Sequence, residues 1–177
     1  MTTPALQTAR LVLRPLQRAD REAIVAGIND LEVSRWLARV PFPYGLADAD
    51  WFLDYLAGGA ERAWGIFDAD GPAGVVGLGE EFGYWLARSH WGRGHATEAG
   101  RAVLGAHFSD PEAGPVAAGH VADNAPSVRV LAKLGFAHAG PRVIRCRALN
   151  RDMASRTMVL TPDAWQRLSN PRRSSIG

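Results

Sequence analysis

The feature that most limits what this chain can fold into is a glycine-rich turn between a strand and a helix. Residues 90–98 read His-Trp-Gly-Arg-Gly-His-Ala-Thr-Glu and follow the apolar, strand-like residues 82–87. The first backbone N–H groups of a helix have no partner within the helix, and the helix dipole adds partial positive charge there. Gly92 and Gly94 lack the Cβ atoms that would hold a bulky phosphate away from the backbone. The turn therefore predicts a binding site for a phosphorylated ligand.

The length and composition of the chain indicate which broad class of protein it belongs to. Its 177 residues predict a single domain, and 47% hydrophobic with 21% charged residues is typical of a soluble globular protein. No apolar run is long enough to cross a membrane, and the N-terminus lacks the apolar segment of a signal peptide. The single cysteine, Cys146, excludes an intrachain disulfide, and we interpret it as an inert thiol. We therefore expect a cytoplasmic protein without a membrane partner.

The charge pattern argues against nucleic acid as the main partner. The formal net charge is only +2, which is too small to indicate nucleic-acid binding by itself. Five arginines nevertheless crowd one region: Arg142, Arg145, Arg147, Arg151 and Arg156. They form either a patch for an acidic partner or the solvated faces of two strands and their loop, and we favour the second interpretation. A ribosome- or RNA-docking role for this region predicts strong, salt-dependent binding.

Local patterns predict strands and helices in an order that departs from strict alternation. Asp70-Gly71 between two apolar runs is the strongest hairpin signal in the chain. The predicted strands are residues 11–16, 63–68, 73–78, 81–87, 116–121, 136–144 and 156–160. The predicted helices are 20–28, 31–38, one from Asp48 or Asp50 to residue 56, 95–108 and 126–134, with a last short one from Thr161. This order is typical of a mixed α/β sheet domain and not of a doubly wound nucleotide fold.

The same order excludes two large classes of nucleotide-binding protein. A dinucleotide-binding glycine motif follows the first strand and has an acidic residue about twenty residues later, whereas this turn follows a late antiparallel strand. The turn also lacks the Gly-Lys-Ser/Thr ending of a nucleoside-triphosphate loop.

A second block gives the turn a more specific meaning. Residues 124–136 read Asn-Ala-Pro-Ser-Val-Arg-Val-Leu-Ala-Lys-Leu-Gly-Phe. Together with Tyr-Trp-Leu at 84–86, the glycine turn and Ala-Thr-Glu-Ala at 96–99, this block resembles the GCN5-related N-acetyltransferase (GNAT) superfamily. Within it the chain is most similar to the branch of ribosomal-protein N-terminal acetyltransferases of the RimJ/RimL type. The resemblance runs from residue 8 to residue 161.

The resemblance implies a fold and a donor. The fold is a single α/β (α+β) domain over residues 1–170, with a flexible tail at 171–177. Its sheet has about seven mostly antiparallel strands flanked by helices, and the neighbouring parallel strands 81–87 and 116–121, the fourth and fifth, splay apart in a V. Acetyl-CoA lies in that opening, and its pantetheine arm pairs with the free edge of the first of these strands, as in strand addition.

The resemblance also assigns donor-binding residues. The predicted contacts are the backbones of Trp85, Leu86 and Ala87, the turn residues Trp91, Gly92, Arg93, Gly94, His95 and Ala96, the Thr97 hydroxyl, and Asn124 and Ser127. Trp91 stands where the wider superfamily has Arg or Gln. The alternative to a donor contact is that Trp91 only packs beneath the loop. Asn124 and Ser127 are also ordinary helix-capping residues. The side chains of Arg93 and Arg129 either touch a CoA phosphate or lie in solvent.

The implied reaction is direct transfer of the acetyl group to a primary amine, either a protein N-terminal α-amine or a small amine. Deprotonating a lysine-type amine at neutral pH costs roughly 4–5 kcal/mol, and an α-amine only about 1 kcal/mol. Glu81 and Glu80, at the start of the strand beside the thioester, are the candidate bases, and Ser127 is the candidate proton donor to the thiolate. The connection between Leu78 and Glu81 is shorter than in most relatives, which leaves open which glutamate acts.

The remaining predictions concern the acceptor and the partners. Trp36, Phe42 and Tyr44, in and before a proline-rich segment, are the candidate acceptor-binding residues, because an amine cation can rest on aromatic rings. The five histidines show no metal-ligand spacing, so we expect no metal. A homodimer fits the resemblance. A rival function is a non-catalytic acyl-CoA sensor of the same fold, which would bind CoA without turnover.

Overall fold

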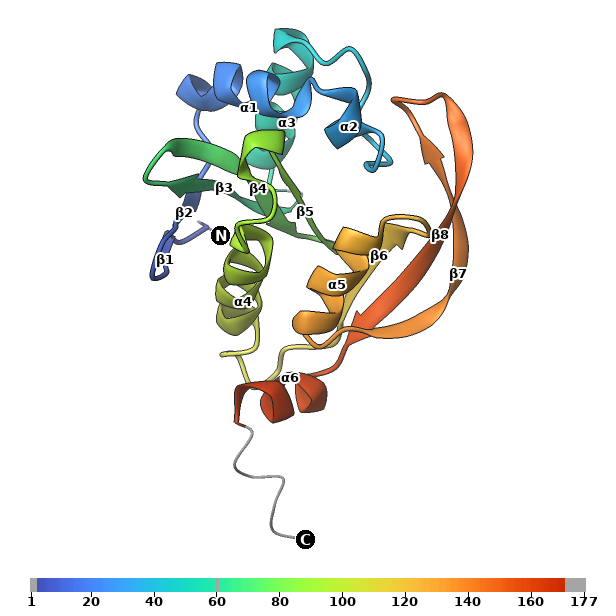
Figure 1. Ribbon diagram of the computed structural model, residues 1–177. Coiled ribbons are helices and arrows are strands. Elements are labelled where there is room, and N and C mark those ends of the chain that lie inside the picture. The colour runs from blue at the N-terminus through green and yellow to red at the C-terminus, as the bar shows by residue number, and fades with distance from the viewer. Residues whose placement is uncertain (1–2, 60, 171–177) are drawn as a thin grey trace, which may run out of the picture.

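The computed structural model describes residues 3–59 and 61–170, which form one eight-stranded sheet with helices on both faces (Figure 1). The strand order is β1-β2-β3-β4-β5-β6-β8-β7. The strands are β1 (Leu6–Gln7), β2 (Val12–Pro15), β3 (Arg62–Asp68), β4 (Gly71–Leu78), β5 (Phe82–Leu86), β6 (Val116–Val121), β7 (Ala137–Cys146) and β8 (Arg151–Leu160). The helices are α1 (Arg21–Ile28), α2 (Leu31–Ser34), α3 (Leu46–Ala57), α4 (His95–His107), α5 (Ala125–Lys133) and α6 (Pro162–Ser169), with 3-10 turns η1 (Arg18–Asp20) and η2 (Arg88–His90). The predicted mixed α/β class is confirmed.

The predicted opening in the sheet lies between β5 and β6. These strands are parallel and pair at one position, Phe82 with Ala118, whereas the neighbouring antiparallel pairs run along whole strands. Beyond Phe82 the edge of β5 that faces β6 is therefore unpaired. The extra strand β1, which pairs Leu6 with Leu13, makes the splaying strands the fifth and sixth instead of the predicted fourth and fifth.

Two apolar clusters fix the two sides of the sheet. The larger lies where α4 and α5 cover the sheet and includes Trp64, Val103 and Leu131, each about 1% exposed. The smaller lies among α1, α2 and α3 and includes Ile24 and Leu53. Because this packing holds both helix layers to the sheet, the N-termini of α4 and α5 are fixed next to the opening (Figure 1).

The hairpin of β7 and β8 is longer than predicted and reaches toward α2 (Figure 1). Its turn is tight, with Asn150 at a φ of 49°, so the two strands pair up to Cys146 and Arg151. The Arg147 N–H donates to the Ala38 carbonyl at 3.1 Å, and the buried Cys146 lies nearby. This contact ties the hairpin turn to the segment after α2, which ends at Ser34 and not at the predicted residue 38.

Other element boundaries differ by a few residues. Helix α3 begins at Leu46, before the predicted start, because the Asp48 carboxylate accepts the Gly45 N–H at 2.9 Å and closes the first turn. The predicted tail, residues 171–177, lies outside the described residues. Among the residues that are described, no helix has the length and apolar content that crossing a membrane requires.

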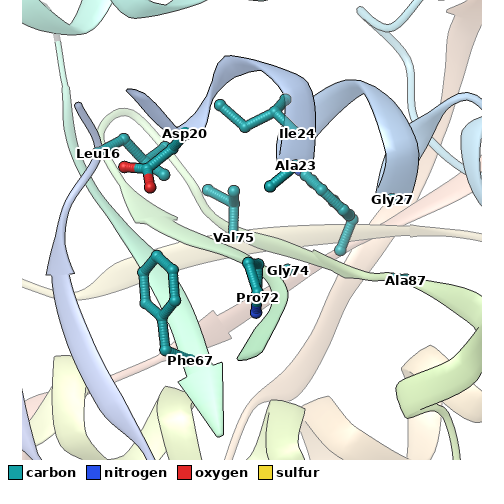
Figure 2. A pocket seen from close by; sticks show the side chains of 11 residues that line it. Leu16, Asp20, Ala23, Ile24, Gly27, Phe67, Pro72, Gly74, Val75 and Ala87 are labelled. Carbon is teal, nitrogen blue, oxygen red and sulfur yellow. The ribbon is translucent and has the colours of Figure 1, made fainter. Parts of the chain in front are cut away.

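A small hollow between α1 and the sheet is separate from the opening. Leu16, Asp20 and Ile24 lie on its α1 side, and Phe67 and Val75 lie on its sheet side (Figure 2). Its volume of about 20 Å³ suffices for about one water molecule, so it is a packing defect and not a ligand site.

Candidate active site

A cleft with a volume of about 1120 Å³ runs through the opening between β5 and β6. At one end it is bounded by the starts of α4 and α5, and at the other by α2, α3 and the β7–β8 hairpin. The two ends of the cleft are thus lined by different elements.

The glycine turn has the geometry of an anion cradle. Gly92 has a φ of 73° and Gly94 a φ of 82°, in the left-handed region that favours glycine. Gly94 is the N-cap of α4, so the first free N–H groups of that helix follow it directly. The turn residues on the cleft are Trp91, Gly92, Gly94, His95, Ala96 and Thr97.

The side chains of the turn are bonded within the protein. The Trp91 indole N–H donates to the Leu86 carbonyl at 2.9 Å, which agrees with packing against the loop. The Arg93 guanidinium donates to the Asp70 carboxylate at 2.8 Å, and the Arg93 carbonyl accepts from Arg10. Arg93 does not line the cleft and its guanidinium is bonded to Asp70, so the structure does not support the predicted contact of its side chain with a phosphate.

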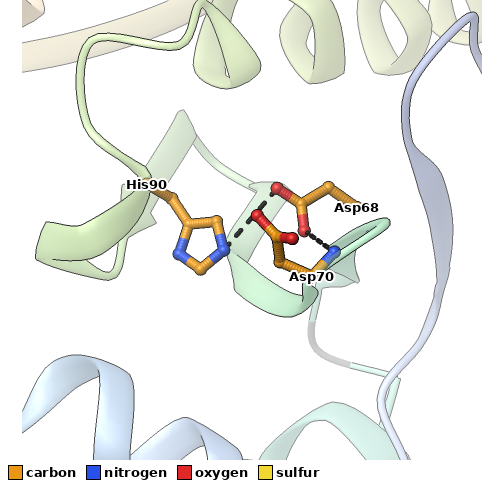
Figure 3. A group of neighbouring side chains, drawn as sticks. All are labelled: Asp68, Asp70 and His90. Carbon is orange, nitrogen blue, oxygen red and sulfur yellow. Dashed lines mark hydrogen bonds and ion pairs between the residues drawn. The ribbon is translucent and has the colours of Figure 1, made fainter.

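His95 has a buried side chain, which the sequence did not predict. Its Nε2 is 2.8 Å from the Asp68 carboxylate. The ring of His90 faces the same carboxylate at 3.6 Å (Figure 3). Asp68, Asp70 and His90 place their ligand atoms within 4.8 Å of one another. The Arg93 guanidinium lies 3.6 Å from Asp68 and 2.8 Å from Asp70, so these carboxylates already have a cation of their own.

Along β5, the polar backbone groups of alternate residues face either β4 or the opening toward β6. The Ala87 N–H donates to Ala73 of β4 at 2.9 Å, and in an antiparallel pair this sets Trp85 to face β4 as well. The polar backbone groups of Tyr84 and Leu86 then face the opening. Trp85 and Ala87 were predicted to bond the donor through their backbones, and this register corrects that prediction. Ala87 also does not line the cleft.

Asn124 and Ser127 occupy the start of α5 as predicted, and both line the cleft. The Asn124 side chain accepts the Ser127 N–H at 3.2 Å, which is its capping role. Tyr84, from the opposite wall, places its hydroxyl 3.4 Å from the Ser127 hydroxyl. Burial raises the pKa of Tyr84 above its ordinary value, although the Ser127 contact acts in the other direction. Tyr84 thus remains a protonated hydroxyl at neutral pH.

The two candidate glutamates have different surroundings. Glu81 lines the cleft, and both of its carboxylate oxygens are bonded to the Arg142 guanidinium, one of them at 3.1 Å. Glu80 is exposed and does not line the cleft. The interpretation of the arginine group as solvated faces is therefore wrong for Arg142, whereas Arg145 does pair with Asp152 at the surface.

The end of the cleft beside α2 and α3, where the acceptor-binding residues were predicted, is aromatic. Trp36 and Tyr44 line it, but Phe42 is 40% exposed and does not. Tyr44 is only 6% exposed and packs in the smaller cluster, and burial raises its pKa to about 12, with the Asp48 charge adding to the effect. Trp51 and Tyr55 of α3 also line the cleft, with their rings stacked 5.5 Å apart. Their helical spacing of four residues is the signal that could have found them.

The turn at the start of α4, the open edge of β5 and the start of α5 therefore border one cleft, as the sequence resemblance requires. A family model described as "Acetyltransferase (GNAT) domain" matches residues 10–137, well over half of the chain. The chain belongs to the GNAT acetyltransferase family. It is an N-acetyltransferase.

Two proteins of similar sequence carry the same activity in their names. One is "Uncharacterized N-acetyltransferase YoaA" of Bacillus subtilis, 31% identical over 157 residues, which are 77% of this chain and 85% of that protein. The other is "Uncharacterized N-acetyltransferase p20" of Bacillus licheniformis, 27% identical over 148 residues, 76% of this chain and 83% of that protein.

Solved structures share the fold of this acetyltransferase. Spermidine N-acetyltransferase from Vibrio cholerae, in complex with CoA and spermine, has a TM-score of 0.76 at 21% identity and covers 89% of this chain and 99% of its own. Mycobacterium smegmatis RimJ, in complex with CoA-disulfide, has a TM-score of 0.73 at 19% identity and covers 97% and 98%.

Proposed function

We propose that this GNAT enzyme takes the acetyl group from acetyl-CoA and transfers it directly to a primary amine. The observation that carries the proposal is the joint opening of the glycine turn and the unpaired β5 edge into one cleft. The turn suits a pyrophosphate, and the edge suits the amide groups of a pantetheine arm, so the two together fit CoA better than either fits another ligand.

The donor would bind by a definite set of groups. The backbone N–H groups that follow Gly92 and Gly94 would hold the pyrophosphate. The polar backbone groups of Tyr84 and the backbone N–H of Leu86 would pair with the pantetheine arm, since the Leu86 carbonyl already accepts the Trp91 indole N–H. This arrangement carries the thioester to the start of α5, beside Ser127. Arg129 lines the cleft on α5, which supports a contact with a phosphate of the donor.

The transfer needs one proton to leave the amine and one to reach the sulfur. The amine nitrogen forms a bond to the thioester carbon, and the C–S bond then breaks to give an amide and the CoA thiolate. Glu81 would receive the amine proton, directly or through water. The paired hydroxyls of Ser127 and Tyr84 would supply a proton to the thiolate. A thiolate with a pKa near 8.5 can leave without that proton, so this second aid is modest.

We infer that an α-amine suits this site better than a lysine-type amine. Arg142 already holds both oxygens of Glu81, so the best-placed base is not a free one. An α-amine with a pKa of about 7.7–8.0 needs little help at neutral pH. This preference agrees with the RimJ/RimL-type resemblance, and a neighbour titled "putative ribosomal-protein-serine acetyltransferase" shares the fold at a TM-score of 0.73.

A rival proposal is a non-catalytic acyl-CoA sensor, and the engagement of Glu81 by Arg142 is the observation in its favour. The test is to mix the protein with acetyl-CoA and a panel of α-amino peptides, amino acids and polyamines, and to follow free thiol. Enzyme activity predicts thiol release with at least one acceptor, and Glu81→Gln should slow it more than Glu80→Gln. CoA binding without release on a broad panel would support the sensor.

A further inference from the structure

Asp68 lies at the end of β3, outside the cleft, yet it contacts side chains from both sides of the glycine turn. Its side chain is only 8% exposed. One of its carboxylate oxygens is 2.8 Å from His95 Nε2, 3.6 Å from His90 Nε2 and 3.6 Å from the Arg93 guanidinium. The other oxygen accepts the N–H of Asp70 at 2.8 Å (Figure 3).

These contacts come from three successive parts of the loop. His90 ends η2 before the turn, Arg93 stands between the two glycines, and His95 begins α4. Their side chains meet at Asp68, so one carboxylate fixes the stretch of backbone whose N–H groups face the cleft. Two glycines with positive φ would otherwise leave that stretch with much conformational freedom.

The negative charge of Asp68 also suits a residue that holds the glycine turn. Burial alone would raise the pKa of Asp68, but the hydrogen bond from His95, the Asp70 N–H and the nearby histidines together lower it, so the group is a carboxylate near neutral pH. His90 Nε2 is buried and has no hydrogen-bond partner among the described residues, which leaves Asp68 as the group it faces.

We propose that Asp68 is a positioning residue for the donor: it holds the glycine turn in the conformation that binds the pyrophosphate of CoA. The inference rests on the proposed function, because it concerns affinity for that ligand. It assigns a role in donor binding to a residue that touches neither the donor nor the acceptor.

The primary test compares Asp68→Asn with Asp20→Asn. Asp20 is a matched control because it is another buried carboxylate, bonded to Arg14 at 2.8 Å, and lies outside the cleft. Both variants should lose stability. Only Asp68→Asn should raise the dissociation constant of CoA, measured by calorimetry, and the KM for acetyl-CoA, each about tenfold, while kcat at saturating donor changes less than twofold.

A second variant guards against a failure of Asp68→Asn to fold. His95→Leu removes the shortest contact to Asp68 while His90 and Arg93 remain as its partners, and it should also raise the KM for acetyl-CoA. Both changes act on the same hydrogen bond, the one between His95 and Asp68. The double variant should therefore have a KM for acetyl-CoA within twofold of that of Asp68→Asn alone.

The outcomes separate the two proposals. A wild-type protein that binds no CoA would overturn the proposed function and this inference with it. A wild-type protein that binds CoA, together with an Asp68→Asn variant of equal affinity, would overturn the inference alone. So would a fall in kcat with an unchanged KM, or fully additive effects in the double variant.

Discussion

The guanidinium of Arg142 is bonded to the carboxylate of Glu81 across two intervening strands. Arg142 lies on β7 and Glu81 immediately precedes β5, and the strand order places β8 and β6 between them. The crossing is possible because Gly119 of β6 has no side chain, and a Cβ at that position would overlap the guanidinium. Both residues line the cleft, in the part that we propose receives the amine.

This relationship predicts that Arg142 acts on the acceptor and not on the donor. Arg142→Met should free the Glu81 carboxylate to act as a base and raise kcat/KM for a lysine-type amine about tenfold relative to that for an α-amine, while the KM for acetyl-CoA stays within twofold. Arg145→Met is the matched control, because Arg145 lies on the same strand and pairs with Asp152 at the surface. Steady-state kinetics with each substrate varied would check this, and equal effects of the two variants would contradict it.

The glycine turn predicts a specific loss when Gly94 gains a side chain. Gly94→Ala places a Cβ in the left-handed region, which costs roughly 1–2 kcal/mol of stability, and it does so at the N-cap of the helix whose first N–H groups form the cradle. Gly59→Ala is the control, because Gly59 has a similar φ of 75° and open space around it. Both should lower the midpoint of urea unfolding, but only Gly94→Ala should weaken CoA binding, by tenfold or more in calorimetry.

Much of the fold could be predicted because its signals are local. Asp70-Gly71 between apolar runs predicts the β3–β4 hairpin, and a helix start after Gly94 predicts the cradle. The contacts of Asp68 could not be found in this way, because its partner His95 is 27 residues away in the sequence. The residues next to a histidine in the sequence do not show whether its side chain is buried against a distant carboxylate or exposed to solvent.

The residues predicted to bind the acceptor show the same limit. Phe42 and Tyr44 stand in one proline-rich segment, and the sequence offers no reason to separate them. Tertiary packing places Tyr44 in the apolar cluster of α1–α3 at the wall of the cleft, whereas Phe42 does not line it. Arg142 is hidden in a similar way among arginines that do lie at the surface.

The contact between Tyr84 and Ser127 predicts shared proton donation. Tyr84→Phe removes one of two hydroxyls 3.4 Å apart, so kcat should fall about fivefold and the KM for acetyl-CoA should change little. Ser127→Ala should have a similar effect, and the double variant should fall further than either. Because burial raises the pKa of Tyr84, the wild-type rate should show no loss from ionisation of this group below about pH 10. An unchanged kcat in the double variant would remove both hydroxyls from the mechanism.

The ion pair of Arg14 and Asp20 predicts a pH-dependent contribution to stability. The hydrogen bond from Arg14 lowers the pKa of Asp20 in the folded protein, against the opposing effect of burial, and the Gln17 N–H adds to the lowering. The folded state therefore binds fewer protons than the unfolded one in acid. The stabilisation by this ion pair is complete above the ordinary pKa near 3.9 and is lost as the pH falls through the pKa of the folded state.

Asp20→Asn should lower the free energy of unfolding by about 2 kcal/mol at pH 7, as expected for charged hydrogen bonds. Urea titrations of both proteins should show a constant difference between pH 7 and pH 5 that shrinks below about pH 4, and a difference that grows in acid would show that the sign is wrong.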